Sequence, residues 1–433
     1  MIYAIFAILL ILIGVDCKLN KRIFTPGILF NGIFFITLLL YNFYLSDIQQ
    51  VLSMRLLTTF LLSIIAFNIP TFIFYLKNAK SGKNTIRTQE KKIINLQMSK
   101  KKELIIFLAL VSIFILEVIY NKGFPLLWKL KKENKVYVNF GVPMIHVVFV
   151  SAVTIMGAYS LFKKRCYYKY FYLAIGLLII NRNLIITIIV EGLIFFLLQN
   201  PNFLKNVKNL CIIVACGILV MIVFSVMGNF RTGENTFLNI AQFKESCSWI
   251  PTSIKWVYSY MCFSVSNLNN LFSMTNGGVY HGILTIKNIL PTVLANKIKT
   301  EPFDSYLVSN NFTVSTFADG LYLDFGPVGI IIYCLMLGAL CSFIYSKSKQ
   351  NDRCKLAYSV LSYCVLFLFF INMLFYSPVY FQFIWIILLF SSGEELKNLC
   401  TFKFLKKNKI SDKKSEVEVQ EDLVQEQSNK IDE

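Results

Sequence analysis

Apolar residues fill most of this chain in stretches of 14 to 23 residues, separated by short polar connections. A helix needs roughly 20 mostly apolar residues to cross a bilayer, and about 17 is the usual lower limit. The pattern predicts an all-α fold, a polytopic transmembrane helical bundle of about eleven spans, within a range of about 10–12. The expected spans cover residues 1–15, 27–46, 56–76, 104–120, 140–162, 168–180, 184–199, 209–227, 328–346, 357–375 and 379–393.

Polar residues interrupt the apolar stretch 168–199 at Asn181, Arg182 and Asn183. A single helix of about 30 residues would be about 45 Å long at 1.5 Å per residue, which is well beyond the hydrocarbon core. The interruption therefore favours two helices joined by a turn at Arg182.

One connection, residues 228–327, is much longer than the others and carries as many acidic as basic residues. Within it, the segment Trp256 to Phe272 mixes aromatic residues with Ser and Asn, which is typical of an interfacial or re-entrant helix. Long loops are often functional, so we expect the site here. The predicted parts are an N-terminal bundle at 1–227, this extracytoplasmic loop at 228–327, the C-terminal spans at 328–393 and a largely disordered cytoplasmic tail at 394–433.

Composition excludes a soluble enzyme, a disordered scaffold and a disulfide-rich secreted module. Of the 433 residues, 56% are hydrophobic and 15% are charged, whereas soluble proteins carry roughly 25% charged residues. The net charge of +19 would also suit a nucleic-acid-binding protein. With the N-terminus outside and the C-terminus in the cytoplasm, however, 30 of the 43 Lys and Arg lie in cytoplasmic segments. The positive-inside rule therefore explains the charge, and we expect no nucleic acid among the partners.

Two arginines stand beside span ends on the predicted outer side. Arg182 lies in the short turn between two spans, and Arg231 follows the span that enters the long loop. A guanidinium group binds phosphate oxygens bidentately and does not lose its charge. We therefore expect both arginines to bind a phosphate or diphosphate, with interfacial snorkelling or pairing with an acid as the alternative.

Five residues are candidates for a general base, namely Asp324, Asp319, His281, His146 and Glu191. Glu191 lies within a span, where a carboxylate must face the bundle interior. Asp319 and Asp324 stand near the end of the long loop, where helix capping is the alternative role for Asp324. His146 and His281 are the two histidines of the chain, and either suits proton transfer near neutral pH. The sequence does not rank these five.

Signatures of several enzyme classes are missing from the sequence. It contains no Gly-rich phosphate-binding motif, no H-E-x-x-H motif and no G-x-S-x-G motif. It also lacks a CxxC pair and an outer cluster with metal-ligand spacing. We therefore expect no metal and no cofactor, and a substrate that brings its own leaving group.

The layout and three short stretches resemble the O-antigen and oligosaccharide repeat-unit polymerases of the Wzy type. The layout shared with that family is a long outer loop, an arginine in a tight outer turn, and an arginine after the helix that enters the loop. The three stretches are Gly141-Val142-Pro143 through His146, Tyr258 to Leu271 (ending SNLNNL), and NNFTVSTFADGLYLDFGPVGI at 310–330.

This resemblance implies a metal-independent membrane glycosyltransferase of the bacterial cytoplasmic membrane. Such an enzyme polymerises oligosaccharide repeat units carried on undecaprenyl diphosphate at the outer face, in capsule, exopolysaccharide or O-antigen synthesis. Arg182 and Arg231 would bind the diphosphate, and one of the five candidate bases would accept the proton of the attacking hydroxyl. Flippase and chain-length regulator proteins are further implied partners, besides the lipid bilayer.

Aromatic residues of the long loop would stack on sugars, with an interfacial aromatic belt as the alternative; they are Trp249, Trp256, Tyr258 and Tyr260. Two other functions stay open. An O-antigen ligase-like transferase would use the same donor with a different acceptor, and a flippase would transport the same lipid-linked oligosaccharide.

Overall fold

The computed structural model describes residues 1–20, 24–84, 96, 98–133, 139–163, 166–290, 292–300, 306–309 and 311–391. For residues 78–84, 216, 219, 231, 292 and 293 it describes the backbone alone. Throughout these described residues the regular secondary structure is helical, without a named β-strand, which confirms the all-α prediction. Residues 1–386 form one compact unit, and 387–391 are the described part of a second. The predicted tail at 394–433 lies outside the described residues.

Six of the described helices are long and apolar enough to cross a membrane. These six are α1 (Ile2–Asn20), α3 (Met54–Asn84), α4 (Lys100–Tyr120), α8 (Arg182–Gln199), α9 (Val207–Thr232) and α14 (Asp319–Ser348). The other predicted spans coincide with the shorter helices α2 (Pro26–Tyr41), α6 (Ile145–Ser160), α7 (Tyr168–Leu178), α15 (Asp352–Leu366) and α16 (Ser377–Phe390). The chain is therefore a multi-pass helical membrane protein, and the full number of spans stays a prediction.

The interrupted stretch 168–199 forms two helices, as expected. Helix α7 ends at Leu178, and Ile180 then adopts a φ of 52°. The side chain of Asn181 caps α8 by accepting a hydrogen bond from Leu184 N at 3.1 Å. Arg182 is consequently the first residue of α8 rather than a residue of the turn.

The prediction of one continuous span over 357–375 is wrong in its second half. Helix α15 ends at Leu366, and the chain then forms turns and a short 3-10 helix, Met373–Phe375. The turn is tied to a distant segment because Phe317 N donates to Leu368 O at 2.9 Å. Three phenylalanines keep this turn as apolar as a helix, so hydropathy alone does not reveal the break.

Two helices extend beyond their predicted limits. Helix α9 runs five residues past the predicted end at 227 and stops before Gly233, whose φ is 89°. Helix α14 starts at Asp319, before the predicted start at 328, and is kinked at Gly326 (φ 65°). Pro327 has no N–H to donate to the carbonyl of Leu323, and this oxygen instead accepts bonds from Val279 N at 2.7 Å and Tyr280 N at 3.0 Å.

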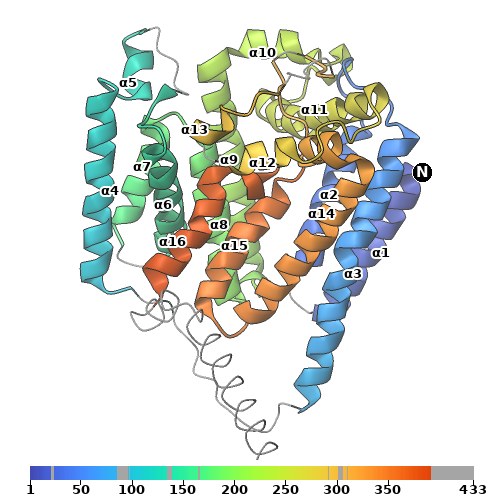
Figure 1. Cartoon of the computed structure of the whole chain (residues 1–433), viewed down its shortest axis with the longest axis horizontal. Helices are drawn as coiled ribbons and strands as arrows, with labels where there is room; N and C mark the ends of the chain where they lie inside the picture. The colour runs from blue at the N-terminus through green and yellow to red at the C-terminus, as the bar shows by residue number, and fades with distance from the viewer. Residues whose placement is uncertain are drawn as a thin grey trace, which may run out of the picture. The chain divides into compact units, whose positions relative to one another are not determined.

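The described residues of the long loop include four complete α-helices, namely α10 (Glu234–Ala241), α11 (Thr252–Met274), α12 (Ile283–Ile289) and α13 (Thr292–Ala295). Helix α11 includes the helix expected at 256–272 and runs crosswise to the bundle helices, over the end of α2 (Figure 1). It packs against α9, α2 and α3. We call this end of the compact unit the α11 end.

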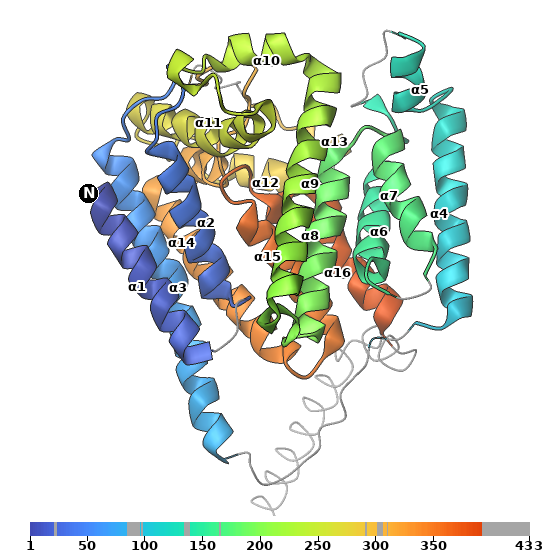
Figure 2. The ribbon, with the colours of Figure 1, turned by 180° about the vertical axis from the view of Figure 1, so that it is seen from behind.

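Glycines allow several helices to approach closely. A Cβ on Gly338 of α14 would lie 2.3 Å from the carbonyl oxygen of Phe67 in α3. A Cβ on Gly192 of α8 would lie 3.1 Å from the Ala158 carbonyl oxygen of α6. Small residues at crossings are typical of membrane bundles. Helix α3 packs against α14, and α1 against α2, on the left in Figure 2, whereas α6 packs against α7 and α4 on the right.

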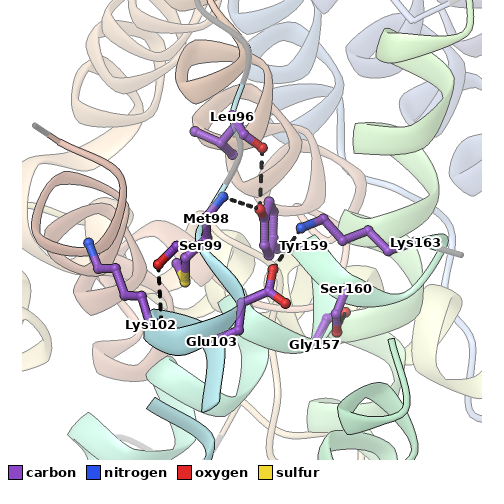
Figure 3. A network of polar contacts seen from close by, with 9 residues as sticks. All are labelled: Leu96, Met98, Ser99, Lys102, Glu103, Gly157, Tyr159, Ser160 and Lys163. Carbon is purple, nitrogen blue, oxygen red and sulfur yellow. Dashed lines mark hydrogen bonds and ion pairs between the residues drawn. The ribbon is translucent and has the colours of Figure 1, made fainter. Parts of the chain in front are cut away.

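A polar network joins the start of α4 to the end of α6 (Figure 3). Lys163 Nζ donates to Glu103 Oε1 at 2.8 Å and lies 3.7 Å from the ring centre of Tyr159. Burial opposes the charge of the ammonium group, but the bonds to Glu103 and Tyr159 outweigh it and raise the pKa of Lys163. The Tyr159 hydroxyl accepts from Met98 N at 3.1 Å and donates to Leu96 O at 3.2 Å, which fixes the segment before α4.

Candidate functional site

A cavity of about 650 Å³ lies between α8, α9 and α11. Its wall changes from polar to apolar along α8, from Arg182 and Asn183 at the start of the helix to Ile186 and Val190. Eight helical residues, from Arg182 to Val190, span about 12 Å. Val220, Met221 and Phe224 of α9 extend the apolar part of the wall. The cavity is therefore amphipathic, with its polar part near the α11 end.

Aromatic rings surround the guanidinium group of Arg182 in this wall. Its Nη2 donates a hydrogen bond to the Tyr260 hydroxyl. Its Cζ lies 4.4 Å from the ring centre of Phe224, 5.1 Å from that of Tyr260 and 5.6 Å from that of Trp256, within cation–π range. A Cβ on Gly228 of α9 would lie 3.1 Å from Arg182 Nη1, so glycine makes room for the guanidinium. Two other helices thus position this charge at the polar part of the cavity.

Arg231, the second predicted diphosphate-binding residue, lies in the last turn of α9 instead of in a loop. Its side chain is outside the described part of the chain, so its place in the site stays a prediction.

His146 lines the same cavity from α6. Its Nδ1 lies 3.0 Å from Oε2 and 3.1 Å from Oε1 of Glu117 in α4. The Glu117 side chain is fully buried, whereas that of His146 is 25% exposed. The sequence candidates did not include Glu117. The signal that could have found it is the same as for Glu191, because Glu117 is a carboxylate inside the predicted span 104–120.

The segment before α6 is shaped around this imidazole ring. Gly141 has a φ of 108° and Met144 a φ of 67°, so the chain bends twice before the helix begins. A Cβ on Gly141 would lie 2.4 Å from His146 Cγ. Glycine is therefore required both for the backbone angle and for the space that the ring occupies.

Two of the other candidate bases accept hydrogen bonds from backbone N–H groups at helix starts, outside the cavity wall. Asp324 Oδ2 accepts from Thr285 N and from Thr285 Oγ1, both at 2.6 Å, and Oδ1 accepts from Leu284 N at 3.1 Å. These bonds cap the start of α12, whereas the capping role expected from the sequence was for the next span. Asp319 Oδ1 accepts from Gly320 N at 2.6 Å at the start of α14.

The remaining two candidates also lie outside the cavity wall. His281 is exposed, with a φ of 49°, in the turn before α12. Glu191 is fully buried in α8, one residue beyond the wall residue Val190. Of the five candidates, the cavity brings His146 together with Arg182.

Of the predicted sugar-contacting aromatic residues, one lines the cavity and three do not. Tyr260 lines the cavity, whereas Trp249 is 79% exposed. Trp256 is buried, donates to Asn229 Oδ1 at 2.7 Å and stacks on Phe237. Tyr258 is buried too, and its hydroxyl donates to Gln49 Oε1 at 2.5 Å and accepts from Leu45 N at 3.0 Å.

Asparagines of α11 fix the segments that complete the wall. Asn267 Nδ2 donates to Phe312 O and to Val314 O, both at 2.7 Å. Its Oδ1 accepts from Val308 N at 2.7 Å. Because Phe312 and Val314 line the cavity, this buried amide determines the position of the wall. Asn269 plays a similar part for the connection between α2 and α3, because its Oδ1 accepts a hydrogen bond from Ser53 N at 2.8 Å.

Comparison with known proteins identifies the family. The family model described as "Putative O-antigen polymerase" matches residues 28–373. No curated protein and no solved structure matches the chain. The matched range includes Arg182, His146, Glu117 and the whole of α11, and the resemblance of the sequence to this family is confirmed. The chain belongs to the O-antigen polymerase family, glycosyltransferase-like membrane enzymes of polysaccharide biosynthesis.

Proposed function

We propose that this protein polymerises undecaprenyl-diphosphate-linked oligosaccharide repeat units at the outer face of the bacterial cytoplasmic membrane, with the lipid diphosphate as leaving group. The observation that supports it most is the shared cavity wall of Arg182 and His146. An oxyanion-binding cation and a group that can accept a proton are the two functions that such a transfer needs.

The graded polarity of the cavity matches the graded polarity of the donor. Near the α11 end, Arg182 would bind the diphosphate, and Asn181 and Asn183 offer amides for sugar hydroxyls. Farther along α8, the apolar wall would hold the first isoprene units of the lipid. Tyr260 is the wall aromatic placed to contact the sugar.

In the proposed reaction, a hydroxyl oxygen of the acceptor's non-reducing sugar attacks the anomeric carbon of the growing glycan. The new C–O bond forms as the bond from this carbon to the diphosphate oxygen breaks, and the electron pair leaves with the diphosphate. The hydroxyl proton passes to Nε2 of His146, which later releases it to water. Arg182 stabilises the charge that develops on the diphosphate.

The α11 end would face the outside of the cell. Connections expected on the outer side from the charge pattern contact one another there, since Asp47 N donates to Gln242 O at 3.0 Å and Ser53 N to Asn269 Oδ1 at 2.8 Å. Two connections expected inside, 77–103 and 347–355, also contact each other, since Leu96 N donates to Asp352 Oδ2 at 3.4 Å. These contacts support the proposed orientation, in which alternating spans place each group of connections on one side of the membrane.

The test is glycan extension by the purified full chain in lipid vesicles supplied with undecaprenyl-diphosphate-linked repeat units. We expect a ladder of glycans and release of undecaprenyl diphosphate. Arg182→Ala should abolish the ladder, and Arg182→Lys should lose most of it because an ammonium group lacks the bidentate fork.

Arg55 offers a matched control at the same end of the bundle. Its Nη1 and Nη2 donate to Asn276 Oδ1 and O, each at 2.9 Å, and it does not line the cavity. Arg55→Lys should keep the ladder. A ladder that survives Arg182→Ala would refute the proposed role of this arginine. Units that cross the bilayer without extension would indicate a flippase, and transfer to a different acceptor alone would indicate a ligase.

A further inference from the structure

In the pair formed by Glu117 and His146, the histidine is the member next to the cavity. His146 lines the cavity and Glu117 does not. Both carboxylate oxygens of Glu117 lie within 3.1 Å of Nδ1. The imidazole ring therefore stands between the carboxylate and the cavity, and within the described chain no residue forms a hydrogen bond with Nε2.

This geometry determines which ring nitrogen carries the proton. An ionised carboxylate only accepts hydrogen bonds, so a neutral imidazole beside it must donate from Nδ1. The lone pair then lies on Nε2, the nitrogen that faces no described partner. The tautomer with the proton on Nε2 would place two acceptors 3.0 Å apart and is disfavoured.

The surroundings hold the ring in this orientation. Phe140 meets the His146 ring edge-on, with centres 5.7 Å apart and planes at 90°. Phe149 lies 6.4 Å from the ring on the same helix. His146 N donates to Val142 O at 2.9 Å, and Gly141 leaves space that a side chain would take from the ring.

We propose that Glu117 is a positioning residue for proton transfer: it holds the proton of His146 on Nδ1, so that Nε2 accepts the proton of the acceptor hydroxyl. When Nε2 takes that proton, both ring nitrogens are protonated, and the carboxylate balances the new positive charge. This inference rests on the proposed function, because it assumes a hydroxyl group in the cavity.

A purely structural ion pair between α4 and α6 is the alternative, and the tautomer distinguishes the two. The chain has two histidines, so ¹⁵N-histidine labelling of the full chain in lipid bilayers gives two imidazole spectra, and His281→Asn assigns them. At a pH at which the ring is neutral, we expect His146 to be protonated on Nδ1. Glu117→Ala should move the proton to Nε2, whereas Glu117→Gln should move only part of it, because its amide can present either its oxygen or its nitrogen to Nδ1.

The same variants are then compared in the vesicle assay. Glu117→Ala should slow extension about 10- to 100-fold, within the usual contribution of general base catalysis, and Glu117→Gln should recover part of the rate. Glu103→Gln is the matched control, because Glu103 is a paired acid of the same helix that lies outside the cavity wall. It should change neither the tautomer nor the rate.

Three outcomes would overturn the inference: an unchanged tautomer in Glu117→Ala, an unchanged rate in that variant, or an equal loss in Glu103→Gln. If Arg182→Ala stops extension and Glu117→Ala does not, this inference fails and the proposed function stands. If neither variant affects extension, the proposed site fails as a whole. Should Glu117→Ala not fold, the rate of Glu117→Gln decides: the amide lacks the negative charge that balances the protonated ring, so an unchanged rate in that variant would contradict the inference.

Discussion

Substituting Gly141 by Ala would test the position of His146 without changing either member of the His146–Glu117 pair. The new Cβ would lie 2.4 Å from His146 Cγ and 2.5 Å from Nδ1. Ordinary contacts begin near 3.4 Å, so the ring must recede by about 1 Å. Nδ1 lies 3.0 Å from Glu117 Oε2. A displacement of the ring by about 1 Å away from the carboxylate would break this hydrogen bond.

The substitution should change both the rate of extension and the stability of the fold, by different amounts. A catalytic group displaced by about 1 Å typically costs about 100-fold in rate, which corresponds to about 2.7 kcal/mol in the activation free energy. The positive φ of 108° at Gly141 adds a cost of about 1–2 kcal/mol to folding for a residue with a side chain. The variant should therefore be slightly less stable and severely slower.

Gly278→Ala provides the control for backbone strain. Gly278 also has a positive φ, 73°, but a Cβ there would meet nothing within 4 Å. Both variants should carry the cost of backbone strain, and Gly141→Ala should lose further stability from its clash with the His146 ring. Only Gly141→Ala should lose about two orders of magnitude in the extension rate per correctly inserted protein. If Gly141→Ala extends glycans within about threefold of Gly278→Ala, the position of His146 does not matter to the reaction and the reasoning above is wrong.

Two further substitutions test parts of the structure around the site. Asn267→Ala removes three buried hydrogen bonds, so thermal unfolding should show a loss of about 3 kcal/mol in the free energy of unfolding, at about 1 kcal/mol per bond. Asn270→Ala removes one hydrogen bond and should cost about 1 kcal/mol. Equal losses in the two variants would contradict the role of Asn267 in the wall. Asp324→Asn keeps an acceptor oxygen for the N–H groups at the start of α12. It should reduce the free energy of unfolding by about 1 kcal/mol while glycan extension continues. A correctly folded variant without extension would instead identify Asp324 as the base.

Hydropathy predicted the helices well where a helix is long and apolar. Stretches such as 104–120 and 209–227 correspond to α4 and α9, because membrane helices satisfy their own backbone hydrogen bonds and so leave a simple apolar signature. The break before Arg182 was also readable, because Asn181 is a preferred helix cap. The turn after Leu366 was not, because its phenylalanines line a cavity and are as apolar as a span.

The site was partly readable. Arg182 and His146 could be selected from the sequence because each is a chemically capable residue near a predicted span end, and Tyr260 because it lies in the aromatic segment of the long loop. Their convergence on one cavity was not predictable, since it depends on how α6, α8 and α11 pack. The contact of Glu117 with His146 joins two helices across a connection, and no periodicity in the sequence reports such a contact.

The most direct measurement is the lipid-linked glycan profile of cells that lack this protein. If it is a repeat-unit polymerase acting at the outer face, single repeat units on undecaprenyl diphosphate should accumulate on the outer leaflet, and polymer should disappear. Units confined to the cytoplasmic leaflet would contradict this function in favour of a flippase, and normal polymer retained on its lipid carrier would contradict it in favour of a ligase.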